Sequence, residues 1–158
     1  MFVFSKDQLS PRLVQIQSLS LFSTLSPREL KVVDGLLHER NYLKGEIIFD
    51  EGEEGQALYI VMSGKVLICR QGQPVTGKLV DRGPGMQFGE LALLDDAPRA
   101  AQVRAEENST LAVFFRADFL GLLETHAVIA SRISLQLARH IGRNLREAVA
   151  GAPTQAAL

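Results

Sequence analysis

Residues 88–103 of this 158-residue chain read FGELALLDDAPRAAQV and interrupt an otherwise β-like pattern. Gly89 and Glu90 are followed by Leu91, Ala92 and two leucines, which are good helix formers, so we expect one or two helical turns between strands. A glycine at the start lets a ligand approach the backbone closely, and the amide groups of a helix start favour an anion. The segment therefore predicts an anion-binding turn.

An arginine follows this turn in a setting that suits a phosphate. Arg99 lies between a proline and an alanine just before a predicted strand. Its planar guanidinium can hold phosphate oxygens in a bidentate manner. Glu90 would repel that phosphate, but it would accept a hydrogen bond from a sugar hydroxyl attached to it. A structural ion pair of Arg99 with Asp95, Asp96 or Glu90 is the alternative role.

This combination indicates a sugar phosphate or nucleotide that is bound and not hydrolysed. The segment contains no P-loop lysine and no evident magnesium site, which argues against hydrolysis of a triphosphate. We therefore expect a binding module and not an enzyme, with no metal site and no resident cofactor.

Outward from this segment, residues 41–116 have the pattern of a β domain. Short apolar runs alternate with turns that carry most of the glycines, which is typical of a sandwich, jelly roll or barrel. The predicted strands are 47–49, 57–62, 65–69, 78–80, 101–105 and 111–115.

Helices are predicted on both sides of the β region. Residues 1–40 form an N-terminal helical segment, with a short helix near 12–19 and a second one starting at Ser26, where Pro27 and Glu29 complete a helix-start signature. Residues 117–150 form C-terminal helices, the longer one from about Val128, and 151–158 a tail. The three histidines lie in predicted helices or at their ends, and we interpret each as a surface or helix-end residue: His38, His126 and His140.

Composition narrows the class of protein. The formal net charge of −1 argues against a general nucleic-acid binder. The single cysteine, Cys69, excludes an internal disulfide and lies in an apolar run typical of a core strand. No membrane-length apolar segment or signal peptide is evident, so we expect a soluble cytoplasmic protein with no membrane partner.

Two segments, Phe88 to Leu93 and Pro98 to Ala101, resemble the phosphate-binding cassette of cyclic nucleotide-binding domains. The glycine-bearing segment 52–66 and the entry Leu21 to Leu25 are also similar to that family. The resemblance covers roughly residues 18–145. It implies a mainly β fold with flanking helices: an eight-stranded jelly-roll β-barrel with N-terminal helices, a long C-terminal helix and a cassette over 88–103.

The resemblance also implies a role for each site residue. Arg99 would bind the exocyclic phosphate oxygens, and Glu90 and the Gly89 backbone would hold the ribose 2′-hydroxyl. Backbone amides near Leu91, Ala92 and Ala100 would contact the phosphate, with Phe88 and Ala101 completing the ligand-binding set. Alanine at position 100 resembles the cyclic-AMP type of pocket, whereas Gln102 departs from the usual threonine and leaves the base preference open.

The long C-terminal helix resembles the dimer helix of the catabolite activator family. This implies a homodimer through that helix and a contact of Asn144 with the purine, although the neighbouring Leu145 is apolar where the family is polar. The implied function is a sensor for a cyclic nucleotide, favouring cyclic AMP, with an unknown downstream protein partner and no effector domain attached. The alternatives are the sensor domain of a truncated transcription regulator, a cyclic-GMP-binding variant and an interaction module with a vacated pocket. A cupin-type metalloenzyme is disfavoured because residues 41–115 contain no histidine.

Overall fold

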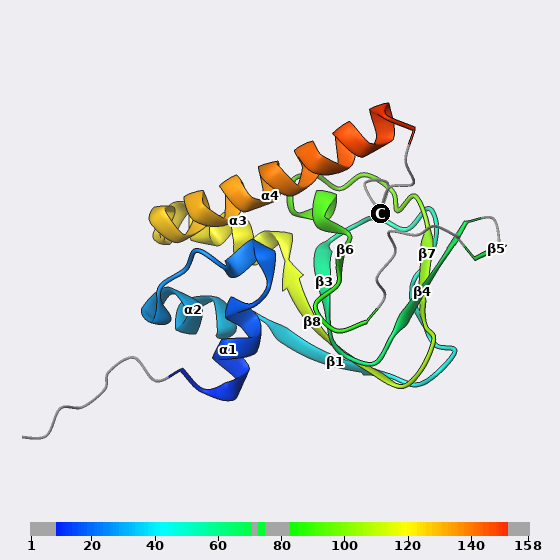
Figure 1. Ribbon diagram of the computed structural model, residues 1–158, viewed down its shortest axis with the longest axis horizontal. Helices are drawn as coiled ribbons and strands as arrows, with labels where there is room; N and C mark the ends of the chain where they lie inside the picture. The colour runs from blue at the N-terminus through cyan, green and yellow to red at the C-terminus, as the bar shows by residue number, and fades with distance from the viewer. Residues whose placement is uncertain (1–8, 71–72, 75–82, 152–158) are drawn as a thin grey trace, which may run out of the picture.

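Two four-stranded antiparallel sheets form the centre of the protein in the computed structural model, which describes residues 9–70, 73–74 and 83–151 (Figure 1). One sheet has the strand order β1-β8-β3-β6 and the other β2-β7-β4-β5. The strands are β1 (His38–Tyr42), β2 (Ile47–Phe49), β3 (Ala57–Ser63), β4 (Val66–Arg70), β5 (Gln73–Pro74), β6 (Gln87–Phe88), β7 (Gln102–Ala105) and β8 (Ser109–Phe115). The mainly β fold with flanking helices is confirmed.

The prediction of one closed barrel needs correction, because the described residues form two separate sheets. The pairs that would extend each sheet, β3 with β6 and β4 with β5, are matched over only two residues each. Of the predicted strands, 78–80 lies outside the described residues. The sequence missed β1 because its side chains are almost all exposed and show no apolar alternation. His38 therefore begins a strand, and the prediction of a helix at that position was wrong.

Helices flank the two sheets on the N-terminal and C-terminal sides, as the sequence predicted. They are α1 (Pro11–Gln17), η1 (Ser20–Phe22), α2 (Pro27–Asp34), η2 (Glu90–Leu93), α3 (Arg116–Thr125) and α4 (Ala127–Val149), where η marks a short 3₁₀ helix. The predicted start of α2 is confirmed: the Ser26 hydroxyl accepts from the Glu29 amide, and the Glu29 carboxylate accepts from the Ser26 amide. The turn predicted after Phe88 is η2.

Strand alternation divides the core into two layers. Successive residues of β3 point to opposite faces of the sheet, so Leu58 and Ile60 pack with the helices, while Val61 packs between the two sheets. The helix-side layer includes Phe22, Phe114 and residues of α4. The layer between the sheets includes Phe49 and Phe88, which connect the core directly to the candidate site.

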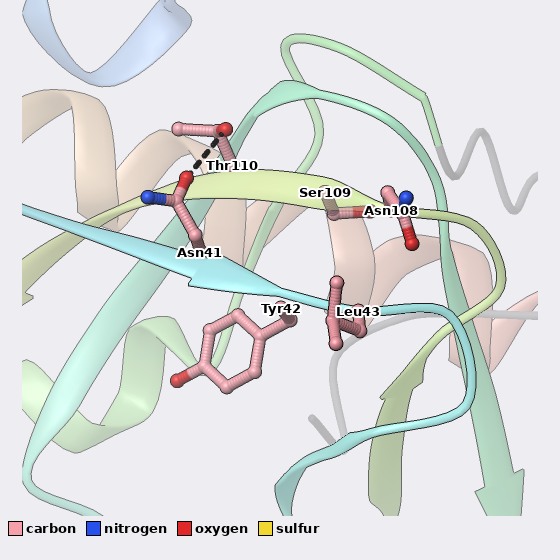
Figure 2. Close-up of a pocket in the computed structure, with 6 residues that line it drawn as sticks. All are labelled: Asn41, Tyr42, Leu43, Asn108, Ser109 and Thr110. Atoms are coloured by element: carbon pink, nitrogen blue, oxygen red, sulfur yellow. Dashed lines mark hydrogen bonds between the residues drawn. The ribbon is translucent and has the colours of Figure 1, made fainter.

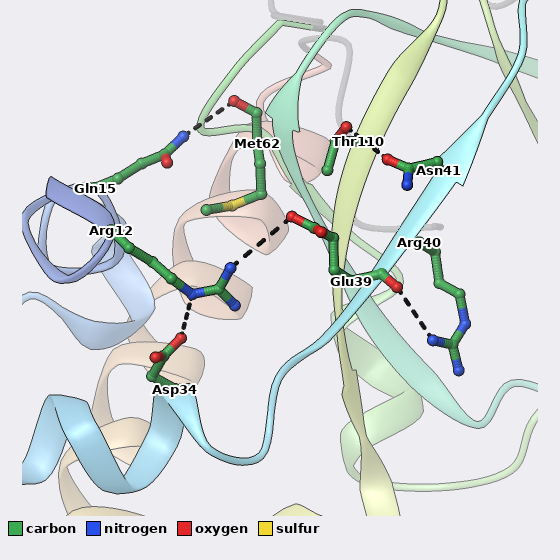
Figure 3. Close-up of polar contacts among 8 residues, drawn as sticks. All are labelled: Arg12, Gln15, Asp34, Glu39, Arg40, Asn41, Met62 and Thr110. Carbon is green, nitrogen blue, oxygen red and sulfur yellow. Dashed lines mark hydrogen bonds and ion pairs between the residues drawn. The ribbon is translucent and has the colours of Figure 1, made fainter.

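Polar contacts fix the N-terminal helices against the sheet (Figure 3). The Arg12 guanidinium pairs with the Asp34 carboxylate of α2 and lies 3.9 Å from the Glu39 carboxylate of β1. The Gln15 side-chain amide donates to the Met62 carbonyl at 3.0 Å. These contacts hold α1 and α2 beside the sheet that also carries β6, the strand leading into the cassette.

The long helix α4 crosses the molecule beside η2 and is coloured orange to red in Figure 1. Its inner face buries Ile129, Ile133 and Leu137, and it also buries Asn144 near its end. No helix in the described part of the chain has the length and apolar character needed to cross a bilayer.

Candidate functional site

Gly89 gives the cassette its shape. It precedes η2 with a φ of 75°, in the left-handed region that favours glycine. A Cβ at this position would lie 2.5 Å from Nη1 of Arg99 and 3.3 Å from the Ala57 carbonyl oxygen. We expected Gly89 to admit a ligand to the backbone. In the structure its missing side chain makes room for the Arg99 guanidinium.

Arg99 is buried at 7% exposure and directs its guanidinium to the cassette turn. Its Nη2 donates to the Ala57 carbonyl at 2.7 Å and its Nη1 to the Gly89 carbonyl at 3.4 Å. Its central carbon lies 4.1 Å from the centroid of the Phe49 ring, within cation–π range. The two hydrogen bonds use two of the five N–H donors of the guanidinium.

The surrounding backbone holds Arg99 from the other side. Its amide donates to the Glu53 carbonyl at 2.7 Å, and its carbonyl accepts from the Gly52 amide at 2.9 Å. Burial lowers the pKa of the Arg99 guanidinium, while Tyr59 and Glu53 act in the opposite direction. Arginine still remains protonated in proteins, so the site keeps a buried positive charge. The alternative role as an ion-pair partner of Asp95, Asp96 or Glu90 is not seen among the described residues, where the guanidinium donates to the Ala57 and Gly89 carbonyls instead.

Arg116, at the start of α3, stabilises the C-terminal end of η2. Its Nη1 donates to the carbonyls of Gly55 (2.8 Å), Ala92 (3.1 Å) and Asp95 (2.6 Å). The last carbonyls of a helix lack partners within the helix, and a cation satisfies them well. The helical turn is therefore fixed between Arg99 at its start and Arg116 at its end.

Glu90 faces the long helix. This carboxylate is only 2% exposed, and its Oε1 lies 2.7 Å from Nε2 of His140 on α4. Asn144, one turn further along α4, places its Nδ2 3.2 Å from the same imidazole nitrogen. Residues separated by fifty positions in the sequence thus form one polar cluster between cassette and helix.

The second oxygen of Glu90 identifies what the site lacks. Oε2 is buried and has no hydrogen-bond partner among the described residues. A buried carboxylate oxygen without a donor is costly, so such atoms in native proteins call for an explanation. A hydroxyl is a donor that fits this acceptor, and the nearby Arg99 can bind an anion. The residues present therefore fit a sugar that carries a phosphate.

The structure brings together four of the predicted site residues: Gly89, Glu90, Arg99 and Asn144. Phe88 and Ala101 point into the layer between the sheets, where the Phe88 ring stacks 5.4 Å from that of Tyr59. Leu91 and Ala100 are exposed beside the cluster.

Ala92 is buried, and its amide donates to the Gly89 carbonyl at 3.1 Å to close the turn.

Sequence reasoning missed three contributors: His140, Phe49 and Arg116. The prediction that His140 is a surface or helix-end residue is wrong, since it lies inside α4 and its side chain is 18% exposed and contacts Glu90. One signal was present, because His140 precedes Asn144 by four residues and so shares its helix face. Phe49 and Arg116 carried no such local signal.

A pocket of about 210 Å³ lies at the end of the β1–β8 pair where Tyr42 meets Ser109 (Figure 2). Several of its polar groups bond within the protein: the Thr110 hydroxyl donates to Asn41 Oδ1 at 2.8 Å, and Asn108 Oδ1 accepts from the Lys44 amide at 2.8 Å. Within residues 9–70, 73–74 and 83–151, no group of three or more His, Cys, Asp or Glu is placed to hold a metal ion. The cluster at η2 is therefore the candidate site.

Two packed sheets hold a buried arginine beside a short helical turn, and a helix covers that turn. These features define a β domain built to bind a small ligand. Comparison with known sequences gives the family. The chain belongs to the cyclic nucleotide-binding domain family, whose sequence profile matches residues 39–126, more than half of the chain.

Individual relatives agree with this family. The cyclic AMP receptor protein of Thermus thermophilus is 40% identical over 124 residues, which cover 77% of this chain and 56% of that protein. A cAMP-dependent protein kinase regulatory subunit of Emericella nidulans is 38% identical over 108 residues, covering 68% of this chain and 26% of that protein. The crystal structure of the Thermus thermophilus catabolite activator protein aligns with a TM-score of 0.73 at 38% identity, covering 84% of this chain and 61% of that one. The chain thus spans little more than half of the first relative and about a quarter of the second.

Proposed function

We propose that this protein is a non-catalytic sensor that binds cyclic AMP at the cluster of Arg99, Glu90 and Asn144. The observation that carries the proposal is the buried Oε2 of Glu90, which lacks a donor next to a buried arginine. A cyclic nucleotide supplies both a sugar hydroxyl and a phosphate anion on one rigid ring system. Two of the similar proteins are named as a cyclic AMP receptor protein and a cAMP-dependent protein kinase regulatory subunit, and these names support this choice of ligand.

Each residue has a distinct role in this proposal. Arg99 binds the exocyclic phosphate oxygens with the N–H donors that it does not give to carbonyls. The Phe49 ring stacks against its guanidinium. Glu90 accepts the ribose 2′-hydroxyl on Oε2. The amides near Leu91 and Ala100 lie in the exposed parts of the cassette and complete the contact with the phosphate.

The preference for adenine over guanine is supported by the small side chain at Ala100. Gln102 already pairs with Asp50 at 2.9 Å and with Arg104 at 2.9 Å. Asn144 on α4 would contact the purine, which would connect the base directly to the long helix. Binding would signal by favouring one position of α4 over another, because a ligand shifts a conformational equilibrium only through its different affinity for the two states.

Calorimetric titration with cyclic AMP and cyclic GMP tests this function. We expect cyclic AMP to bind more tightly, and Arg99→Ala to weaken it by about tenfold to several hundredfold, because charge-assisted hydrogen bonds to the phosphate are lost. Arg28→Ala, which removes an exposed arginine of α2, should leave the affinity unchanged. Unchanged cyclic AMP affinity in the Arg99→Ala protein would refute the assignment.

We also propose that α4 pairs with the α4 of a second copy. Its outward face carries apolar residues seven apart at Val128, Leu135 and Val149, with Gly142 at the intervening step. Beside this row, Leu94 and α4 form an apolar groove of about 340 Å³. A coiled-coil partner would cover this surface.

A further inference from the structure

The Glu90–His140 contact joins two elements that are far apart in the sequence. Glu90 lies on η2 and His140 on α4, and their 2.7 Å contact is largely shielded from solvent. Glu90 has one oxygen on His140 and the other without a donor. His140 therefore fixes the orientation of the carboxylate that the proposed ligand must contact.

The charges around this pair leave the site short of positive charge when His140 is neutral. On the sheet side the acidic groups are Glu90 and Glu53, and Arg99 interacts electrostatically with both of them and with the Arg116 guanidinium. On α4 the neighbouring charged residues Arg139 and Arg143 are exposed. With a phosphate anion bound, the negative charges of Glu53, Glu90 and the phosphate would face the positive charges of Arg99 and Arg116, and protonated His140 would supply the missing positive charge.

The imidazole proton also decides which neighbour His140 binds. Nε2 lies 2.7 Å from the Glu90 carboxylate and 3.2 Å from the amide nitrogen of Asn144. It must carry a hydrogen to donate to Glu90, and it must lose that hydrogen to accept from the Asn144 amide. Full protonation thus commits the ring to Glu90, whereas the neutral ring has a tautomer that faces Asn144 instead.

We propose that His140 is a pH-dependent positioning residue of the ligand site, which strengthens cyclic nucleotide binding when it is protonated by orienting Glu90 and offsetting its charge. This inference rests on the proposed function. Imidazole is the side chain whose charge ordinarily changes between about pH 5 and 8. Because binding and protonation favour each other, the affinity for cyclic AMP rises as the pH falls, and binding takes up protons.

Calorimetric titration with cyclic AMP between about pH 5.5 and about pH 8, in buffers of different ionisation enthalpy, tests the proposal. For the natural protein we expect an affinity gain of about threefold to tenfold toward the acidic end, with net proton uptake. His140→Arg keeps a permanent cation against Glu90, so its affinity should be high and independent of pH. His140→Gln keeps a donor without the charge, so its affinity should be low and equally independent of pH.

His126→Gln is the matched control, since His126 lies exposed at the junction of α3 and α4 and should retain the full pH dependence. Thermal unfolding of each variant establishes that it is folded. A pH dependence that persists in both His140 variants would overturn the role of His140 and leave the proposed function intact. Absence of cyclic AMP binding by the natural protein at every pH would overturn both.

Discussion

The two halves of the candidate site are built differently. The half on the sheets is tightly packed: Arg99 lies against Phe49, donates to two backbone carbonyls, and fits against glycines whose side chains would collide with it. The half on α4 reaches the cassette through His140 and Asn144, which lie partly open to solvent or at the end of the buried helix face. The sheet half is held mainly by packing, whereas the part of α4 beyond Leu137 contacts the cassette through polar side chains.

This difference assigns ligand binding to the sheet half and the conformational response to α4. A closely packed anchor keeps its geometry whether or not a ligand is present, which favours affinity through preorganisation. The part of α4 beyond Leu137, which is joined to that anchor by polar contacts, can change position for a modest free energy, as a signalling element must. We therefore expect changes in the sheet half to impair folding and binding together, and changes in α4 to alter the response with little effect on the fold.

The largest effect should follow from Gly89→Ala. The added Cβ would lie 2.5 Å from Nη1 of Arg99 on a backbone with a φ of 75°, so both the turn and the arginine must move. We expect the free energy of unfolding to fall by about 1–3 kcal/mol and cyclic AMP affinity to fall by about tenfold or more. Chemical denaturation and calorimetry measure the two effects.

Gly121→Ala is the control for this change. Gly121 lies in α3, where a Cβ meets nothing within 4 Å, so alanine should raise the stability of the protein by about 0.5–1 kcal/mol and leave binding alone. Normal stability and affinity in the Gly89→Ala protein would show that the sheet half is less tightly constrained than its packing implies.

An intermediate effect should follow from Leu135→Glu on the outward face of α4. Leu135 is 52% exposed in the single chain, so glutamate, a good helix former, should preserve the fold. If this face covers a second copy, the charge should raise the dimer dissociation constant by roughly tenfold or more. Light scattering across a concentration series measures it. Leu120→Glu, on the exposed side of α3, should not change the size of the particle.

The sequence allowed good prediction where a feature depends on near neighbours in the chain. The capping residues at Ser26 and Glu29, the turn at Gly89 and the placement of Arg99 in the site all followed from residues within a few positions. Contacts across long separations could not be predicted in the same way. Phe49 meets Arg99, and His140 meets Glu90, only because two sheets and a helix pack in one particular arrangement.

The same limit applies to the strands. β1 is an edge strand with little apolar surface, and the sequence gives it no periodic signal. The short pairs at β5 and β6 are set by their neighbours in the sheets, so the two-sheet arrangement became visible only in three dimensions.

The smallest effect should follow from Arg132→Ala, which removes the pair between the Arg132 guanidinium of α4 and the Glu29 carboxylate of α2. The Arg132 side chain is largely exposed, and exposed pairs contribute only about 0–1 kcal/mol. Glu29 would keep its bond to the Ser26 amide at 2.9 Å, so the capping box should survive. We expect the free energy of unfolding to fall by about 0.5 kcal/mol or less, and this loss to vanish at high salt.

Binding by the same variant tests which contact holds α4 to the rest of the molecule. If the Glu90–His140 pair is the functional tether, Arg132→Ala should leave cyclic AMP affinity and its pH dependence as they are in the natural protein. A change in that pH dependence would mean that the α2 end of the helix controls its position, because an exposed pair far from the cassette can reach the ligand only by moving α4 as a whole. Calorimetric titration of Arg132→Ala and His140→Gln with cyclic AMP distinguishes the effects of contacts at the two ends of α4, because only His140→Gln changes a group that contacts the site.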